Sequence, residues 1–189
     1  MFEIDLNDLS GKILLATPSM SHSIFKDTVI FLCSHSEDGA MGVIINKPIQ
    51  ALSFSSICKD LEIKDEVPLD LPVLFGGPVE KNRGVILHSQ DYNAEKETLK
   101  CTSTLSMTAS FTILSDLAKG LGPANALLAL GYAGWAPDQL ESELASNCWM
   151  FGKLEDKEIF STDFDQKWSN SLKNSGVEPS NISSNFGSA

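Results

Sequence analysis

The chain has 189 residues, with 25 acidic and 14 basic side chains and a formal net charge of −11 at pH 7. This length allows one substantial hydrophobic core and does not demand a second one. The negative charge, together with a single arginine, Arg83, disfavours direct binding to the phosphate backbone of a nucleic acid.

No apolar run approaches the roughly 20 residues that a membrane-spanning helix needs, and the first residues lack the basic segment of a secretion signal. We therefore expect a cytoplasmic protein without a membrane partner. The cysteines are dispersed and form no C-x-x-C pair, so we predict reduced thiols that fill the core at Cys33, Cys58, Cys101 and Cys148.

In chain order, the apolar periodicity predicts strands over 12–16, 28–34 and 43–46, a helix over 53–63, strands over 73–79, 84–89 and 97–105, a helix over 107–120, a strand over 125–135, and helices over 136–147 and 162–176. Strands that alternate with helices indicate a mixed α/β (α+β) fold, and the hairpins exclude a purely parallel sheet. We expect a single compact domain over residues 1–176, followed by a flexible, Ser- and Asn-rich tail over 177–189.

Two of these predictions depend on particular residues. Strands 28–34 and 43–46 should be antiparallel neighbours joined by a turn that contains Gly39 and Gly42, with Pro48 ending the second strand. The helix over 107–120 is predicted because one helical face collects Met107, Phe111, Leu114 and Ala118.

Cys33 and His35 are weak candidates for catalysis. Two residues apart on a strand, their side chains should leave the same face about 6 to 7 Å apart, whereas thiol activation needs a base within about 3 Å. The acidic Glu37 and Asp38 that follow disfavour a thiolate. We therefore favour a core-filling Cys33 and a strand-end His35, and keep as an alternative a cysteine enzyme whose base comes from elsewhere in the fold.

Common signatures of nucleotide-binding proteins, zinc proteases and serine hydrolases are missing from the chain. The histidines, His22, His35 and His88, lie in separate segments without a closely spaced ligand partner. We predict neither a metal nor a cofactor.

A set of motifs in this order and spacing resembles the YqgE/AlgH family of bacterial proteins: GKILLATPSM, TVIFLCSH, GAMGVIINKP, VLFGGPV, RGVILHS, ALGYAGWAPDQLESELASNCW, and then Phe160 with Trp168. The resemblance covers about residues 10 to 176. It departs from the family pattern at His22, where Asp is usual, and at Asp27, where a basic residue is usual. The resemblance implies a compact mixed α/β domain with a strongly curved, barrel-like mixed sheet flanked by helices.

The function that the resemblance implies is that of candidate transcriptional regulators, a label that comes from indirect effects on gene expression. We therefore expect a non-enzymatic regulatory protein that binds a small ligand or a protein partner and does not contact DNA directly. An enzyme of unrecognised class that uses Cys33, and a structural scaffold, stay open as alternatives.

Three motifs that each follow a buried apolar strand form the candidate binding site: Asn46, Lys47 and Pro48; Gly76, Gly77 and Pro78; Gly134 and Trp135. We expect turns at the carboxyl ends of strands, where ligands of open α/β sheets tend to bind. Glycines allow close backbone approach, and Trp135 and Asn46 offer an apolar wall and an amide. In the competing interpretation, glycine and proline only turn the chain and Trp135 only packs.

Overall fold

A computed structural model describes residues 8–64, 69–94 and 97–177 of the chain. Its strands are β1 (Ile13–Ala16), β2 (Val29–Ser36), β3 (Gly39–Ile44), β4 (Pro48–Ser53), β5 (Pro72–Phe75), β6 (Val79–Ser89), β7 (Thr98–Lys100), β8 (Leu105–Thr108), β9 (Ala126–Trp135) and β10 (Trp149–Gly152). Its helices are α1 (Phe54–Asp60), α2 (Phe111–Ala118), α3 (Gln139–Ala145), α4 (Asp156–Ile159) and α5 (Phe164–Asn174), with a 3₁₀ turn, η1 (Pro18–Met20).

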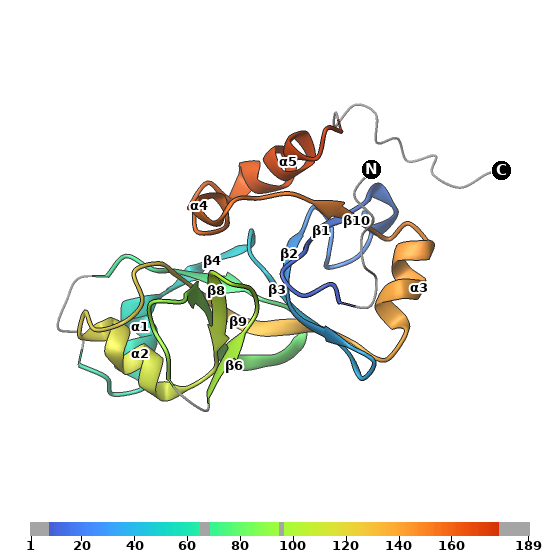
Figure 1. Ribbon diagram of the computed structural model, residues 1–189. Helices are drawn as coiled ribbons and strands as arrows, with labels where there is room; N and C mark the ends of the chain where they lie inside the picture. The colour runs from blue at the N-terminus through green and yellow to red at the C-terminus, as the bar shows by residue number, and fades with distance from the viewer. Residues whose placement is uncertain (1–7, 65–68, 95–96, 178–189) are drawn as a thin grey trace.

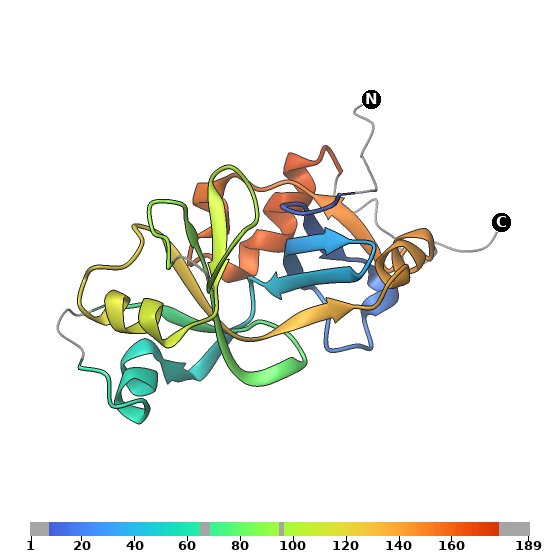
Figure 2. The same ribbon diagram turned by 60° about the horizontal axis from the view of Figure 1, so that its bottom comes forward.

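The long strand β9 joins two parts of a strongly curved sheet (Figures 1 and 2). The strand order is β10-β1-β2-β3-β9-β6-β8-β7, and β5 pairs with β9 on one side and with β4 on the other. The β5–β9 pair is parallel, while the other strand pairs are antiparallel. The predicted mixed α/β fold with a curved sheet flanked by helices is therefore confirmed.

Helices cover the sheet at three places (Figure 1). α5 lies above β1 and β10 with α4 to its left, α3 packs beside β3 and β10, and α1 and α2 cover the opposite end of the molecule. The buried apolar side chains accordingly form three clusters, one beneath each group of helices. Within the described ranges, no helix combines the length and apolarity that a membrane crossing requires.

The predicted hairpin is confirmed. β2 and β3 are antiparallel, with Phe31 opposite Val43, and Cys33 is 1% exposed. The helix predicted over 53–63 is also present as α1, and Ser53 caps it by accepting a hydrogen bond from the backbone N–H of Ser56. Local sequence signals suffice for these elements because the capping residue and the apolar runs are themselves local.

The predicted start of the helix at residue 107 is wrong. Met107 lies in β8, opposite Leu87 of β6 and Leu99 of β7, and α2 begins at Phe111 after Ser110. Pairing within the sheet overrides the helical spacing of the apolar residues. The strand predicted over 97–105 is divided into the antiparallel strands β7 and β8 by a turn in which the backbone N–H groups of Cys101 and Thr102 donate to the carbonyl of Leu105.

The predicted turns around glycine also need correction. Gly42 lies inside β3, whereas Gly39 is the first residue of this strand, directly after the turn, with a positive φ of 123°. Gly134 and Trp135 are the last two residues of β9 and not a turn after it. Pro48 begins β4, a position where a strand tolerates proline because its first residue need not donate to the ladder. Of the predicted tail, residues 178–189 lie outside the described part of the chain.

Candidate functional site

A β-bulge separates Cys33 from His35. The pairing of β2 with β3 shifts between Leu32 and Ser34, and a shift of one residue turns the following side chains to the other face. Cys33 faces the core cluster beneath α5. His35 is opposite Ala40, which belongs to the cluster beside α3. The prediction that both side chains leave the same face is therefore wrong.

His35 connects three segments of the chain. Its Nδ1 accepts a hydrogen bond of 3.2 Å from the backbone N–H of Leu9, so its Nε2–H donates to the Glu141 carboxylate on α3 at 2.6 Å. Its backbone N–H donates to the hydroxyl of Ser10. These contacts explain the position of His35 by structural hydrogen bonding, with no need for a substrate.

The Cys33 thiol is poorly suited to nucleophilic attack. The hydrogen bond that it shares with Cys101, followed by burial, raises the pKa of the Cys33 thiol well above its usual value. A high pKa keeps the sulfur protonated, whereas the thiolate is the nucleophile. The bulge also removes His35 as its base, which leaves the core-filling interpretation as the better supported one.

Asn46 holds the turn that precedes β2. It is 7% exposed, its Oδ1 accepts from the backbone N–H of Val29 at 2.8 Å, and its Nδ2 donates to the carbonyl of Asp27 at 2.9 Å. Asp27 has a positive φ of 55°, a conformation that costs energy in a residue other than glycine. The amide of Asn46 thus stabilises a strained residue beside a cleft.

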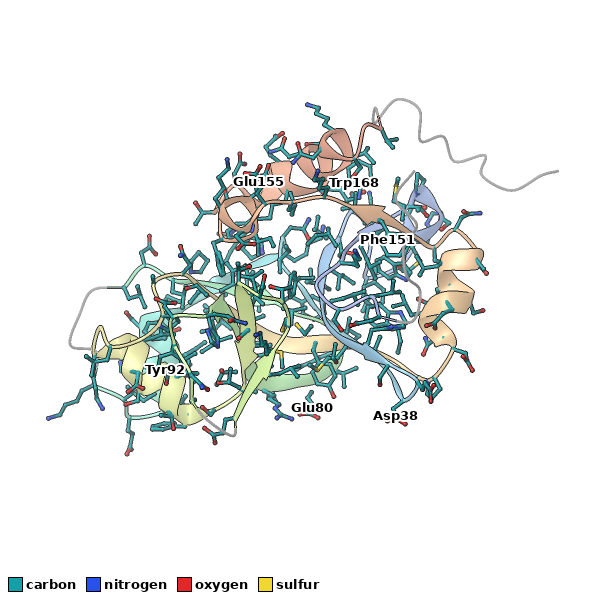
Figure 3. The ribbon with its side chains drawn as sticks, in the orientation of Figure 1. Asp38, Glu80, Tyr92, Phe151, Glu155 and Trp168 are labelled. Atoms are coloured by element: carbon teal, nitrogen blue, oxygen red, sulfur yellow. The ribbon has the colours of Figure 1, made fainter. Side chains whose placement is uncertain are left out.

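This cleft, of about 390 Å³, lies between the β3–β4 connection and α5, and we call it the α5 cleft; it is lined by Asp27, Asn46, Lys47, Pro48, Phe164, Asp165, Trp168 and Ser169. Trp168 projects from α5 toward the sheet (Figure 3) and donates from Nε1 to the carbonyl of Ala16 at 3.0 Å. Within the described part of the chain, the charged groups of Asp27, Lys47 and Asp165 have no ion-pair or side-chain hydrogen-bond partner.

A second pocket, of about 240 Å³, adjoins the α5 cleft and shares Pro48 and Phe164 with it. It extends along β4 and β5, and its lining includes Pro48, Gln50, Leu52, Asp70, Pro72 and Phe164. We call the two pockets together the β4 groove. Half-buried and exposed side chains of β4 line it, so the groove opens toward the surface.

The three predicted motifs meet only in part. The backbone N–H of Phe75 donates to the carbonyl of Lys47, which brings the segments 46–48 and 76–78 side by side. Gly77 contacts β9, because a Cβ at this residue would lie 2.1 Å from the carbonyl carbon of Tyr132. None of the residues that line the α5 cleft comes from 76–78 or from 134–135.

Trp135 has a packing role in the second core cluster. Its Nε1 donates to Glu143 at 2.8 Å, and the same carboxylate oxygen accepts from Trp149 at 2.7 Å. The two indole rings meet edge to face at 6.0 Å between centroids. Trp135 is 7% exposed, and Gly134, next to it, is exposed.

Lys167 is a residue that the sequence analysis missed. It lies on the buried face of α5 and is 2% exposed. Its Nζ donates to the carbonyls of Ile45 at 3.1 Å and Ile159 at 2.5 Å. Burial lowers the pKa of Lys167 to about 8, against a smaller opposite effect of Asp163. The signal was its spacing, three residues after Phe164 on the apolar face of a predicted helix.

His88 is a second buried polar residue without an assigned role. Its Nδ1–H donates to the carbonyl of Ser89, so its Nε2 accepts from the hydroxyl of Thr108 at 2.9 Å. Thr108 is in turn 2.8 Å from the hydroxyl of Thr98. Burial lowers the pKa of His88 below its usual value. The chain of hydrogen bonds satisfies each buried group, which is the expected state of a polar core network.

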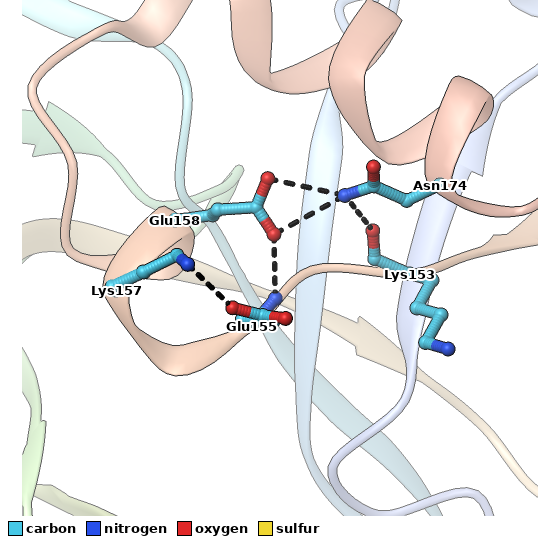
Figure 4. A pocket seen from close by; sticks show the side chains of 5 residues that line it. All are labelled: Lys153, Glu155, Lys157, Glu158 and Asn174. Atoms are coloured by element: carbon cyan, nitrogen blue, oxygen red, sulfur yellow. Dashed lines mark hydrogen bonds and ion pairs between the residues drawn. The ribbon is translucent and has the colours of Figure 1, made fainter.

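The carboxylates that line a pocket of about 260 Å³ beside α4 bond to neighbouring groups of the chain (Figure 4). The Glu158 carboxylate accepts from Asn174 and from the backbone N–H of Glu155, and Lys157 pairs with Glu155 at 2.8 Å. These bonds cap a short helix. In residues 8–64, 69–94 and 97–177, no group of three or more His, Cys, Asp or Glu side chains has a geometry that holds a metal ion.

Comparison with known proteins identifies the family. The model of the AlgH-like family matches residues 13–180 of the chain. The chain belongs to this family. UPF0301 proteins of Cereibacter sphaeroides and Ruegeria pomeroyi are 43% identical over 183 residues and 44% identical over 184 residues, which cover 96% of this chain and 100% of each relative. The resemblance seen in the sequence motifs is therefore confirmed.

Solved structures of the AlgH-like fold agree with this assignment. The solution structure of the AlgH protein from Pseudomonas aeruginosa superposes with a TM-score of 0.77, at 31% identity and with 100% of both chains covered. A crystal structure of a protein from Corynebacterium diphtheriae gives a TM-score of 0.70 at 21% identity, covering 92% of this chain and 89% of that one. The second likeness concerns the fold alone.

Proposed function

We propose that this AlgH-like protein is a non-enzymatic regulatory protein of the cytoplasm, which binds a small ligand or a protein partner and affects transcription indirectly. The observation that supports binding is the α5 cleft, where the charges of Asp27, Lys47 and Asp165 have no ion-pair partner among the residues that the structure describes. Unpaired charges beside the apolar walls of Phe164 and Trp168 are the combination that small-molecule and peptide sites use for orientation and affinity.

The predicted motifs have different parts in this proposal. Lys47 and Pro48 face the ligand, and Asn46 orients the cleft through its hydrogen bonds to the turn before β2. Gly76, Gly77 and Pro78 let the neighbouring segment approach β9 closely enough to support the 46–48 segment, while Gly134 and Trp135 belong to the scaffold on which the cleft is built.

The alternative, a cysteine enzyme, has less support. Cys33 is buried, its pKa is raised, and His35 lies on the other face of the strand. A nucleophile needs a base in hydrogen-bond reach and an approach for the substrate, and Cys33 has neither among the described residues.

The test is differential purification from a bacterial lysate. Ser169→Trp fills the α5 cleft, and Ser142→Trp places the same bulk on an exposed position of α3 as the matched control. Bound small molecules and proteins are identified by mass spectrometry, and thermal unfolding midpoints verify that both variants fold. We expect a molecule that the wild type and Ser142→Trp retain and Ser169→Trp loses. Identical sets from all three proteins would contradict a binding role of the cleft.

A further inference from the structure

We propose that the β4 groove binds a basic, extended segment of another protein that also carries apolar side chains. This inference rests on the proposed binding function of the α5 cleft and names the class of its partner. It follows from three properties of the groove: its extent along β4, the apolar side chains that line it and its charge.

The length of the groove matches a short extended segment. The α5 cleft and the second pocket adjoin at Pro48 and Phe164, and the second pocket extends along β4. β4 has 6 residues, and a strand of this length spans about 17 to 20 Å. A drug-sized molecule fits an enclosed pocket, whereas a groove open along a strand fits a chain.

Both polar and apolar side chains of β4 line the groove. They are Pro48, Ile49, Gln50, Leu52 and Ser53, so successive as well as alternate residues of the strand reach it. Leu52, with 36% exposure, is the exposed apolar residue among them. The groove therefore offers apolar contacts beside its charged groups.

The peptide is assigned to the face of β4 and not to its edge. Among the described strands, β4 pairs only with β5, but its register shifts between Pro48 and Ser53. Irregular edges of this kind resist the addition of another strand. Apolar contacts from Phe164, Trp168 and Leu52 must therefore supply most of the affinity, with the charged groups giving orientation.

The charge of the groove determines the sign of the charge that its partner carries. Three exposed carboxylates line it, those of Asp27, Asp70 and Asp165, against the single ammonium of Lys47. Within the described ranges none of these groups has an ion-pair partner. The net charge of −11 adds a field that raises the encounter rate with basic segments and repels acidic ones.

The test uses three fluorescein-labelled peptides of about eight residues, with alternating Lys and Leu, Glu and Leu, or Lys and Ser. Fluorescence polarisation at about 150 mM salt measures their affinity for the full chain. We expect the Lys-Leu peptide to bind at least about tenfold more tightly than either of the others, because it alone satisfies both the charge and the apolar surface.

The decisive comparison is between two charge-reversed variants of equal net charge. Asp70→Lys/Asp165→Lys alters the groove, while Glu37→Lys/Asp38→Lys alters the β2–β3 turn, away from Trp168 (Figure 3). We expect the first to weaken binding of the Lys-Leu peptide by about tenfold or more and the second by less than about twofold. Equal weakening by both would mean non-specific attraction and would overturn the proposal.

Other outcomes assign the groove to other occupants. Absence of Lys-Leu binding, or equal binding of the Glu-Leu peptide, overturns the proposal that the groove binds a basic segment. If Ser169→Trp still loses a small molecule in the purification, the binding function stands while the peptide class falls. A dimer in sedimentation equilibrium that Asp70→Lys/Asp165→Lys dissociates would identify a second copy of the chain as the occupant and would equally overturn the proposal.

Discussion

Lys167 carries its ammonium group where the sheet meets α4 and α5. Its two carbonyl partners, on Ile45 and Ile159, connect the end of β3 with the end of α4. Two neutral acceptors compensate only part of the desolvation of a charge, which is why burial lowers the pKa to about 8. Because Ile45 immediately precedes Asn46, the bond from Lys167 to Ile45 also helps to position one wall of the α5 cleft.

The contribution of the buried Lys167 to stability should rise with pH. Its pKa is about 8 in the folded chain and 10.5 in the reference state, so between these values this residue binds more protons in the unfolded chain. The Lys167 contribution to the free energy of unfolding must then increase with pH in this window, by roughly 2 kcal/mol between pH 8 and pH 10, whereas the raised pKa of the Cys33 thiol acts in the opposite direction. Guanidinium unfolding of the wild type and Lys167→Met over this range measures the difference.

Lys173→Met is the matched control, since Lys173 is exposed on the same helix. It should keep the pH dependence of the wild type. Lys167→Met leaves two carbonyls without their donor, so its absolute stability should fall at every pH. The informative quantity is the slope, and parallel curves for the wild type and Lys167→Met would contradict the account of its pKa.

Cys33 should resist alkylation in the native protein. It is 1% exposed, and the Cys101 thiol and burial keep its pKa high. At neutral pH, maleimide should react first with Cys148, which is only half-buried, and with Cys33 only after unfolding. Mass spectrometry of digested protein after timed labelling measures the order.

A Cys33→Ser variant provides the control for this labelling. If the fast phase of the wild type disappears in Cys33→Ser, the thiol is accessible and the cysteine-enzyme alternative regains support. Retention of the fast phase in Cys33→Ser and its loss in Cys148→Ser would agree with a thiol that fills the core.

At the scale of elements, the sequence predicts what is long and regular. β2, β9 and α5 have continuous apolar runs or clear helical spacing. The sequence does not predict β10 or α4, each of 4 residues; β1 is as short but stands out as a continuous aliphatic run. β4 is mostly exposed and has no apolar run. The bulge in β2 leaves no signal in the sequence because it is defined by pairing with β3.

The candidate site was predictable in its parts but not in its assembly. Asn46, Lys47 and Pro48 stand out as a motif, and the spacing of Phe164 and Trp168 predicts their shared face on α5. That these two segments face each other across a cleft follows only from the packing of α5 on the sheet. Trp135, which the sequence also singles out, turns instead toward Glu143.

Gly77 should be the glycine on which the neighbouring segments 46–48 and 76–78 most depend. Its φ is 154°, and an added Cβ would lie 2.1 Å from the Tyr132 carbonyl carbon. Gly77→Ala should therefore destabilise the fold by roughly 3 kcal/mol or more, since strain and overpacking each contribute about 1 to 3 kcal/mol. Urea unfolding midpoints measure this change.

Gly134→Ala is the control from the same set of motifs. The nearest atom to an added Cβ there is 3.5 Å away, in ordinary contact, and no positive φ is required. We expect its unfolding free energy to lie within about 0.5 kcal/mol of the wild type. Equal effects of the two substitutions would show that close approach to β9 is not what requires Gly77.

At the scale of the whole molecule, the net charge of −11 decides between partners that the groove alone does not separate. A nucleic acid and a basic peptide both carry charge and flat or apolar groups, but this negative field repels the nucleic acid and attracts the basic peptide. The described residues also place the only arginine, Arg83, in an ion pair with Glu80 at 2.9 Å. The regulation of transcription proposed above would then act through another molecule.

The isolated chain should consequently form no sequence-specific complex with DNA at about 150 mM salt. Affinity for DNA depends on phosphates neutralised by Lys and Arg, each of which releases counterions, and a net charge of −11 with 14 basic residues disfavours such contacts. Gel shifts with a pool of random duplexes at protein concentrations up to about 10 μM measure this directly. Lowering the salt separates the two partner classes, because it should strengthen binding of the Lys-Leu peptide and leave DNA unbound. A selected DNA sequence retained at sub-micromolar protein would contradict the argument from charge and reopen direct regulation.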